Sequence, residues 1–303
     1  MPSTINTNLV SLNAQRNLSS SQGSLATSMQ RLSSGMRINS AKDDSAGLAI
    51  AERMSSQARG MNVAIRNAND AISMAQTGEG SLGKVGDIFQ RMRELAVQSS
   101  NGSNTTADRA SLNQEYVQLA QEVTRTLNGT QFNGQNVLAA TADSTFQIGA
   151  NNTTTVDRVT VGAFNWSTAA GITDVLGTAV LTGTDVGSYN SATSTYTAGT
   201  DAPTALITDT AGALTAISNL DSALSKVNSQ RSTFGAVQNR FENVVSNLMV
   251  QSENQSAARS RIMDADYAVE TSNLSRANIL QQAGNAMVAQ ANQLPQQVLA
   301  LLR

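Results

Sequence analysis

Residues 78–84, Gly-Glu-Gly-Ser-Leu-Gly-Lys, have the spacing that comes nearest to a phosphate-binding loop in this sequence. They satisfy the dinucleotide pattern GxGxxG and the pattern GxxxxGK, but Val85 stands where a P-loop needs Ser or Thr to hold a magnesium ion. Both patterns need a strand before the glycines and a helix start after them, so that backbone N–H groups face phosphate. The residues before Gly78 have the apolar spacing of a helix, so we interpret 78–84 as a flexible or slightly kinked stretch of helix.

Two close pairs of carboxylates are the other candidates for chemistry: Asp43 with Asp44, and Asp264 with Asp266. A calcium loop needs more oxygen ligands at loop spacing and a central Gly, and neither pair has them. Acidic residues are favourable at a helix start because they lie at the positive end of the helix macrodipole. We therefore expect both pairs to mark helix starts, and we predict no metal and no cofactor.

The chain contains no His and no Cys among its 303 residues. A Ser-His-Asp triad, Cys-His catalysis and a His/Cys zinc site are therefore impossible, so any enzyme would have to work through carboxylates, lysines and hydroxyls. The net charge of −2 does not fit nucleic acid as a partner, because phosphate binding needs clustered Lys and Arg. No apolar run of about 18 residues is present, so we expect neither membrane insertion nor an ordinary cleaved signal peptide.

Small and apolar side chains recur at intervals of three, four and seven along both long flanks of the chain, which is the pattern of a helix seam. The first seam predicts a helix over about 44–100, which residues 101–104 interrupt. A shorter helix follows and ends at 128–129, since Gly commonly terminates a helix. The last seam covers 217–248. The seam residues are Met54, Ala58, Met61, Ile65, Ala68, Ile72, Ala75, Leu82, Phe89 and Ala96; Leu112, Tyr116, Leu119, Val123 and Leu127; and Ile217, Leu220, Leu224, Val227, Phe234, Phe241, Val245 and Leu248.

The two ends of the chain carry narrow apolar seams of their own, with large and small residues alternating near the finish. These residues are Leu18, Leu25, Met29, Leu32 and Met36 near the start, and Leu280, Met287, Leu294 and Leu301 near the finish, with Ala277, Gly284, Ala291 and Val298 between them. One interpretation is a coiled coil that joins the two ends; the other is that the stripes are also buried between copies, because a single narrow helix pair is marginal in water. The candidate subunit-assembly residues are Leu18, Leu25, Leu32, Leu280, Met287, Leu294 and Leu301.

The middle of the chain, from about 141 to 210, is rich in Thr, Ser, Gly and Ala. Alternation in 146–148 and 156–161 predicts two short strands, with a turn at 149–152. A helix of about fifty residues would be on the order of 75 Å long, which predicts a rod. The expected fold is therefore mainly α: an elongated antiparallel helical bundle or coiled coil formed by both chain ends, with a small β-rich central insert.

Sequence motifs at both ends match one known family. They are Ile5-Asn-Thr-Asn8, Gln30-Arg31-Leu32-Ser33-Ser34-Gly35, Arg37-Ile38-Asn39, Ala41 to Ile50, Gln90 to Gln98, Gln131-Phe132-Asn133-Gly134, Phe146 to Ala150, Ala258 to Ile262, Asp266-Tyr267, Ile279 to Gly284 and Pro295 to Arg303. On these motifs the sequence resembles bacterial flagellin over about 1–165 and 205–303. The middle insert matches no family that we can name.

The resemblance implies a structural protein that is not an enzyme and that polymerises into the extracellular flagellar filament for swimming. It implies that residues 1–44 and 264–303, here called the terminal arms, form the inner filament core. Residues 45–165 with 205–263 would form a long-helix bundle with a β-hairpin in the outer core, and 166–204 a solvent-exposed insert. Open helical assembly follows from a heterologous contact that does not close.

The same resemblance implies unfolded export by the flagellar type III apparatus without a cleaved signal peptide. The implied partners are copies of the chain, an export chaperone, the filament cap and hook-junction proteins. A hook–filament junction protein shares such helical ends and is the alternative function. Some flagellins carry a zinc protease in the insert, which the absence of His excludes here.

Recognition by host innate immunity is a further implication. Residues 90–98 resemble the site read by Toll-like receptor 5, and the C-terminal segment resembles the one read by inflammasome receptors of the NAIP family. The first site would comprise Gln90, Arg91, Leu95, Gln98 and Glu115, with Arg91 and Leu95 as principal contacts. The second would comprise Leu299, Leu301 and Leu302.

Overall fold

The computed structural model describes residues 8–166, 169, 172–176, 188–190, 195–197 and 206–301. The chain divides into two compact units, Met1–Arg59 with Gln251–Arg303 and Gly60–Val250. Both boundaries between the units fall inside long helices, α2 (Ser45–Ser100) and α5 (Thr210–Met263). Each unit is described separately below.

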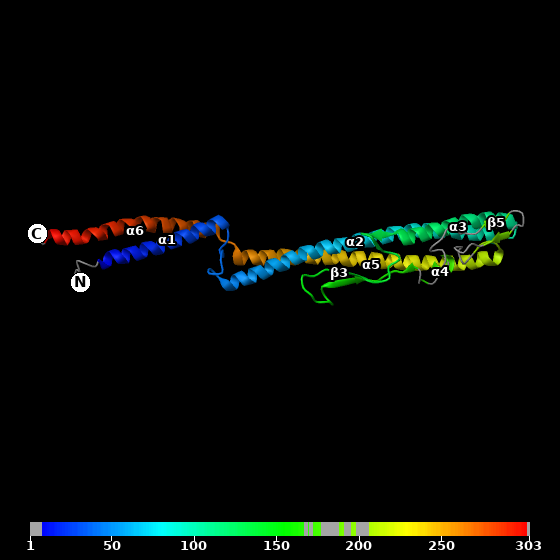
Figure 1. Cartoon of the computed structure of the whole chain (residues 1–303), viewed down its shortest axis with the longest axis horizontal. Coiled ribbons are helices and arrows are strands. Elements are labelled where there is room, and N and C mark those ends of the chain that lie inside the picture. The colour runs from blue at the N-terminus through cyan, green and yellow to red at the C-terminus, as the bar shows by residue number, and fades with distance from the viewer. Residues whose placement is uncertain are drawn as a thin grey trace. The chain divides into compact units, whose positions relative to one another are not determined.

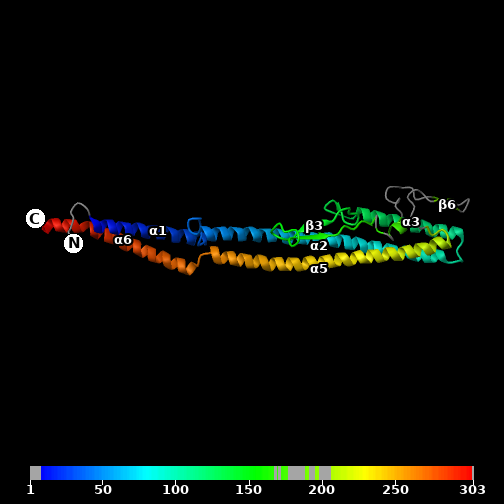
Figure 2. The ribbon, with the colours of Figure 1, turned by 90° about the horizontal axis from the view of Figure 1, so that it is seen from below.

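In the first unit, helices α1 (Leu9–Ser34) and α6 (Tyr267–Leu301) lie side by side (Figures 1 and 2). Helix α1 begins because the Asn8 side chain accepts a hydrogen bond from the Ser11 amide, and it ends at Gly35, whose φ is 70°. Asn8 also donates from Nδ2 to the Ala291 carbonyl at 2.7 Å. Because the start of α1 therefore meets the later part of α6, the two helices are antiparallel.

A short extended joint follows α1. The Arg37 amide donates to the Met263 carbonyl at 2.6 Å, and the Ala265 amide donates to the Gly35 carbonyl at 2.9 Å. Met36, expected as the last residue of the N-terminal helix seam, instead forms an isolated antiparallel bridge with Asp264. The reason is the left-handed Gly35, which ends the helix before Met36 can join it.

The carboxylate pairs mark helix starts only in part. Asp44 and Asp266 do: Asp44 accepts from the Gly47 amide at 2.8 Å, and Asp266 accepts from the amides at the first turn of α6. Asp43 instead closes a loop by accepting from the amides of residues 40 and 39, and these hydrogen bonds lower its pKa. Asp264 follows the end of α5 and accepts from the Ser260 hydroxyl, so its predicted position at a helix start is wrong.

The second unit packs parts of α2 and α5 against α3 (Thr106–Gly129). All the seam residues predicted for these helices are buried or partly buried, which confirms the heptad interpretation. Residues 78–84 lie within the continuous helix α2, with no strand before them. A Cβ at Gly78 would lie 2.9 Å from the Phe234 ring, so close helix packing explains this glycine without phosphate.

Three small antiparallel hairpins are present among the described residues: β1 (Gln131–Phe132) with β2 (Gln135–Asn136), β3 (Ser144–Gln147) with β4 (Arg158–Val161), and β5 (Ser188–Asn190) with β6 (Thr195–Thr197). The predicted strands correspond to β3 and β4, but the connection is longer than the predicted turn. The Asp157 carbonyl accepts from the amides of Ile148 and Gly149, and its carboxylate accepts from the Thr153 amide. These bonds hold residues 148–157 as a loop, so β4 begins later than expected.

The predicted insert is not solvent-exposed throughout. The Trp166 side chain is only 1% exposed, and its indole Nε1 donates to Asn128 Oδ1 at 3.1 Å. The short helix α4 (Ile172–Leu176), which the sequence did not predict, buries Ile172, Val175 and Leu176. The expectation that 166–204 is solvent-exposed is therefore wrong for these residues, because apolar side chains lie within it at helical spacing.

The predicted fold class is confirmed: the chain is mainly α, its two ends pair as antiparallel helices, and a small β-containing insert lies between the long helices. Within the described part of the chain, no helix is both long and apolar enough to cross a membrane.

Candidate functional site

The seam of the terminal arms pairs large side chains of α1 with small ones of α6. Leu18, Leu25 and Leu32 are all partly buried on α1, and on α6 Ala277 and Ala291 are buried. Gly284 lies opposite Leu18, whose Cδ1 would be 3.1 Å from a Cβ at that glycine. The small residues of α6 thus allow the two helices to approach closely.

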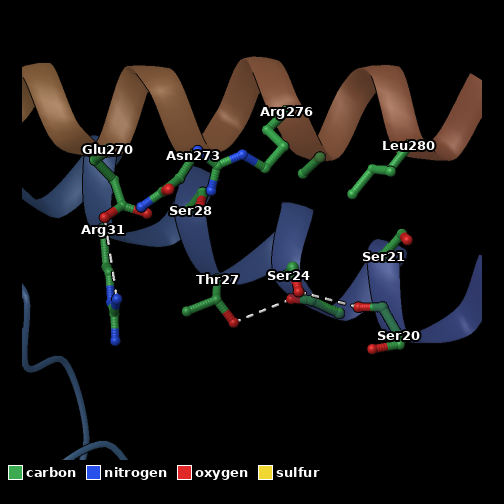
Figure 3. A pocket seen from close by; sticks show the side chains of 12 residues that line it. Ser20, Ser21, Ser24, Thr27, Ser28, Arg31, Glu270, Asn273, Arg276 and Leu280 are labelled. Carbon is green, nitrogen blue, oxygen red and sulfur yellow. Dashed lines mark hydrogen bonds and ion pairs between the residues drawn. The ribbon is translucent and has the colours of Figure 1, made fainter. Parts of the chain in front are cut away.

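The large residues of α6 do not lie in this seam. Leu280 is 51% exposed and Met287 is 58% exposed, and Leu280 lines the groove at the edge of the α1–α6 contact (Figure 3), so the predicted place of these two residues in the seam is wrong. A step of three residues along a helix turns about 300°, which moves Leu280 to the side of Ala277. Leu294 and Leu301 belong to α6, but their side chains lie outside the described residues.

A polar groove of about 650 Å³ runs beside the seam (Figure 3). On α6, the Glu270 side chain is 8% exposed, and the nearest atoms of its carboxylate and the Arg31 guanidinium are 4.0 Å apart. On α1, the hydroxyls of Ser24 and Thr27 donate to carbonyls of their own helix. These two hydroxyls of the polar lining are therefore already engaged within their own helix.

A second candidate surface lies in the other unit, where Arg91 of α2 joins α3. Its Nε and Nη2 donate to Glu115 Oε1 at 3.0 and 2.8 Å, and its Nη1 donates to Glu94 Oε2 at 3.0 Å. These hydrogen bonds to Glu94 and Glu115 raise the pKa of Arg91. The network fixes the guanidinium on an exposed face.

Four of the five residues expected at the receptor site share this exposed character. Gln90, Arg91, Gln98 and Glu115 are exposed, whereas Leu95 is only 1% exposed and belongs to the main hydrophobic core. The structure thus brings Arg91 and Glu115 together and separates Leu95 from the surface. Leu95 turns inward because it shares a helix face with buried residues of α2.

The sequence interpretation missed Glu94 as a partner of Arg91. Its position three residues along the same helix is a recognised spacing for an ion pair, so charge patterning could have found it. The Arg93–Asp221 pair, with 2.7 Å between Nε and Oδ1, joins helices that are distant in sequence. No local pattern indicates that pair.

The C-terminal leucines fall at the end of the described chain. Leu299 and Leu301 belong to α6, but their side chains are outside the described residues, as is the whole of Leu302. Their exposure therefore stays a prediction.

Comparison with known proteins matches both ends of the chain to one family. The family model of the bacterial flagellin N-terminal helical region matches residues 5–143, and that of the bacterial flagellin C-terminal helical region matches 217–302. A flagellin of Halalkalibacterium halodurans is 45% identical over 300 residues, covering 99% of each chain. A flagellin of Serratia marcescens is 44% identical over 351 residues, covering 100% of each. The crystal structure of Bacillus cereus flagellin aligns at 32% identity with a TM-score of 0.46, covering 64% of this chain and 94% of that one.

Paired terminal helices and a bundle of long helices with a small β-containing insert define the class of the protein as mainly α-helical. The chain belongs to the bacterial flagellin family. It is accordingly a structural subunit of an exported flagellar filament.

Proposed function

We propose that this chain polymerises through its terminal arms into the filament that propels a swimming cell. The observation that carries the proposal is the apolar surface that the α1–α6 pair leaves uncovered. Large apolar side chains on both arms are between 47% and 67% exposed, among them Leu9, Val10, Leu12, Ile279, Leu280 and Met287. Burying them against other copies gives a favourable free energy that the separate pair of arms lacks.

In this proposal, residues 1–44 and 264–303 form the inner core of the filament, and 45–165 with 205–263 form the outer core. Support comes from the difference in packing between the two regions. The α2–α3–α5 core already buries large side chains such as Phe89, Tyr116 and Phe241 within one chain. The arms bury mostly small residues, so they gain more from contact with other copies.

Removal of residues 294–303 tests the assembly role, because it takes away the predicted apolar positions Leu294 and Leu301. We expect the truncated chain to form no filaments in electron microscopy while its α-helical circular dichroism signal is largely retained. A second variant keeps the full length and replaces Leu280 and Met287 by Ser. It is expected to raise the concentration needed for polymerisation.

The matched control is Gln282→Ser with Gln290→Ser, which changes exposed polar positions of the same helix. Normal filaments from both the truncated chain and the Leu280/Met287 variant would contradict the proposal. The full-length chain should form long filaments by itself. If it forms none, the junction between hook and filament becomes the better assignment.

We also propose that the chain is exported unfolded through the flagellar type III apparatus. The absence of Cys supports this, because no disulfide has to form or break during transit. The exposed apolar side chains of the arms would aggregate before assembly, so we propose that an export chaperone covers them. At the filament ends we propose that cap and hook-junction proteins cover the same surface.

A further part of the proposal is recognition of the monomer by Toll-like receptor 5. The support is the fixed, exposed guanidinium of Arg91 with Glu115, flanked by Gln90 and Gln98. Arg is favoured at binding hot spots because its planar fork donates several hydrogen bonds at once. We assign Leu95 a supporting role beneath this surface, since its side chain is buried.

We propose finally that the C-terminal leucines are read by inflammasome receptors of the NAIP family. Three leucines within residues 299–302 would present an apolar segment in the monomer. Changing Leu299, Leu301 and Leu302 together to Ala is expected to abolish caspase-1 activation after delivery to macrophage cytosol, while signalling through Toll-like receptor 5 persists. Unchanged caspase-1 activation would rule this part out, and loss of both responses would indicate a folding defect instead.

A further inference from the structure

The chain holds three Asn-Gly pairs, at 101–102, 128–129 and 133–134. The Asn of such a pair can lose its side-chain amide spontaneously, without an enzyme, in the reaction called deamidation. The backbone nitrogen of Gly attacks Cγ of the Asn side chain, ammonia leaves, and a succinimide ring forms. Water then opens the ring at either carbonyl to give aspartate or isoaspartate. Gly favours the attack because it has no side chain to hinder it, and water is the only co-reactant.

The fold puts Asn133 and Gly134 at the tip of the β1–β2 hairpin. Phe132 pairs with Gln135, so Asn133 and Gly134 alone form the turn, with φ of 50° and 76°. Both residues are exposed, and a Cβ at Gly134 would meet nothing within 4 Å. The Gly134 amide lies between the paired positions and takes no part in the strand ladder. The nucleophile and the Asn side chain are therefore both open to water.

Asn128 has the same neighbour but a different environment. It lies in α3, and Gly129 is the last residue of that helix. Asn128 Oδ1 accepts the hydrogen bond from the buried Trp166 indole at 3.1 Å. A helical amide donates to the carbonyl four residues earlier, which holds its nitrogen away from the preceding side chain. The Asn128 side chain and the Gly129 amide are thus both held in hydrogen bonds.

Asn101 is engaged as well. Its Oδ1 accepts from the Ser103 amide at 3.3 Å, and its carbonyl accepts from Arg109 Nη2 at 3.0 Å. Of the three pairs, only 133–134 therefore combines an exposed turn with an Asn side chain that makes no hydrogen bond among the described residues.

We propose that Asn133 is a site of spontaneous deamidation in the folded chain and that the fold protects Asn128. The reaction adds a negative charge to the turn, and the isoaspartate product also adds a carbon to the backbone. A two-residue turn has no room for an extra backbone atom, so this product breaks the β1–β2 pairing. Val137, whose amide donates to the Thr130 carbonyl at 3.1 Å, then loses the support of the hairpin.

The test compares the full folded chain with the same chain in concentrated urea, both incubated in mildly alkaline buffer and digested with trypsin. The tryptic peptide from Thr126 to Arg158 contains both pairs, and tandem mass spectrometry assigns the amide-to-acid mass gain to one Asn. We expect Asn133 to convert about tenfold or more faster than Asn128 in the folded chain, because the helix must first open locally. In urea the two should convert at similar rates.

Two variants sharpen the result. Asn133→Asp removes the reacting amide, so the mass gain at that position should disappear. Gly129→Ala, at a helical position where a Cβ meets nothing within 4 Å, should leave the conversion of Asn133 unchanged. Similar rates for Asn128 and Asn133 in the folded chain would overturn the proposal. So would an Asn133 that converts in urea but not when folded.

Discussion

At the scale of single residues, Arg91 connects two helices through one guanidinium. The side chains of Arg91, Glu94 and Glu115 are 51%, 67% and 46% exposed, so their ion pairs are screened by water. Exposed pairs of this kind contribute little to stability. Their main consequence is geometric, because the guanidinium is held in one orientation on the surface.

Arg91→Ala is expected to reduce Toll-like receptor 5 signalling by about tenfold or more, since a fixed Arg at the centre of an interface is a typical hot spot. The measurement is a dose–response curve of reporter cells with monomeric protein. Arg93→Ala is the matched control: it removes a similar exposed ion pair, to Asp221 of α5, from the same helix. Equal signalling by the Arg91 variant and the unmodified chain would remove this site from the proposal.

At the scale of elements, the start of α3 depends on a capping box. The Thr105 side chain accepts from the Asp108 amide, and Asp108 accepts from the hydroxyl and the amide of Thr105. These hydrogen bonds lower the pKa of Asp108, the hydroxyl contributing most. They satisfy backbone donors that the first turn of a helix otherwise leaves open.

A pH dependence follows from this lowered pKa. A carboxylate whose pKa is lower in the folded chain stabilises it above the unfolded pKa, and this stability is lost as the pH falls through the folded pKa. We expect Asp108→Asn to be less stable than the unmodified chain at neutral pH, with the difference shrinking in acid. Urea unfolding at several pH values measures it, and Ser111→Ala on the same helix is the control. A difference that is constant with pH would contradict the assignment.

The close approach of α1 and α6 gives a second prediction for an element. A Cβ at Gly284 would lie only 3.1 Å from Leu18 Cδ1. Gly284→Val adds two methyl groups beyond that Cβ, so the two helices must move apart. We expect faster hydrogen exchange in both helices and weaker polymerisation. Gly23→Val makes the same change on α1 where nothing lies within 4 Å, so it should not destabilise the helix, because Val has a slightly higher helix propensity than Gly. Equal exchange in the two variants would argue against close packing at Gly284.

At the scale of the whole molecule, we expect a deletion in the insert to be tolerated if it removes no buried side chain. Removing residues 178–203 is expected to leave filament formation and motility largely intact, because a segment rich in Thr, Ser, Gly and Ala between long helices contributes little to helix packing. Removing 166–203 also takes away Trp166 and the buried side chains of α4. Losing a buried Trp alone typically costs about 3–5 kcal/mol, so this larger deletion should lower the thermal unfolding temperature.

Electron microscopy and thermal unfolding of the two deletion variants test this. Failure of the shorter deletion to form filaments would mean that the insert takes part in assembly. Equal thermal stability of the two variants would mean that Trp166 contributes less than its burial indicates.

The sequence by itself determined the long helices, because apolar spacing along α2, α3 and α5 reports directly which residues share a face. It also excluded His and Cys chemistry outright and identified helix starts such as Asp44 and Asp266. These features depend on residues that are near one another in the chain, so a local pattern contains the necessary information.

Only the tertiary structure decided which residues of α6 form the seam with α1. Large and small residues alternate there with equal periodicity, and the choice of Gly284 over Leu280 depends on how closely the Leu18 side chain can approach. The burial of Leu95 and Trp166 likewise depends on packing against helices that are distant in sequence. Periodicity defines the faces of a helix, but shape complementarity with its neighbours determines which face is buried.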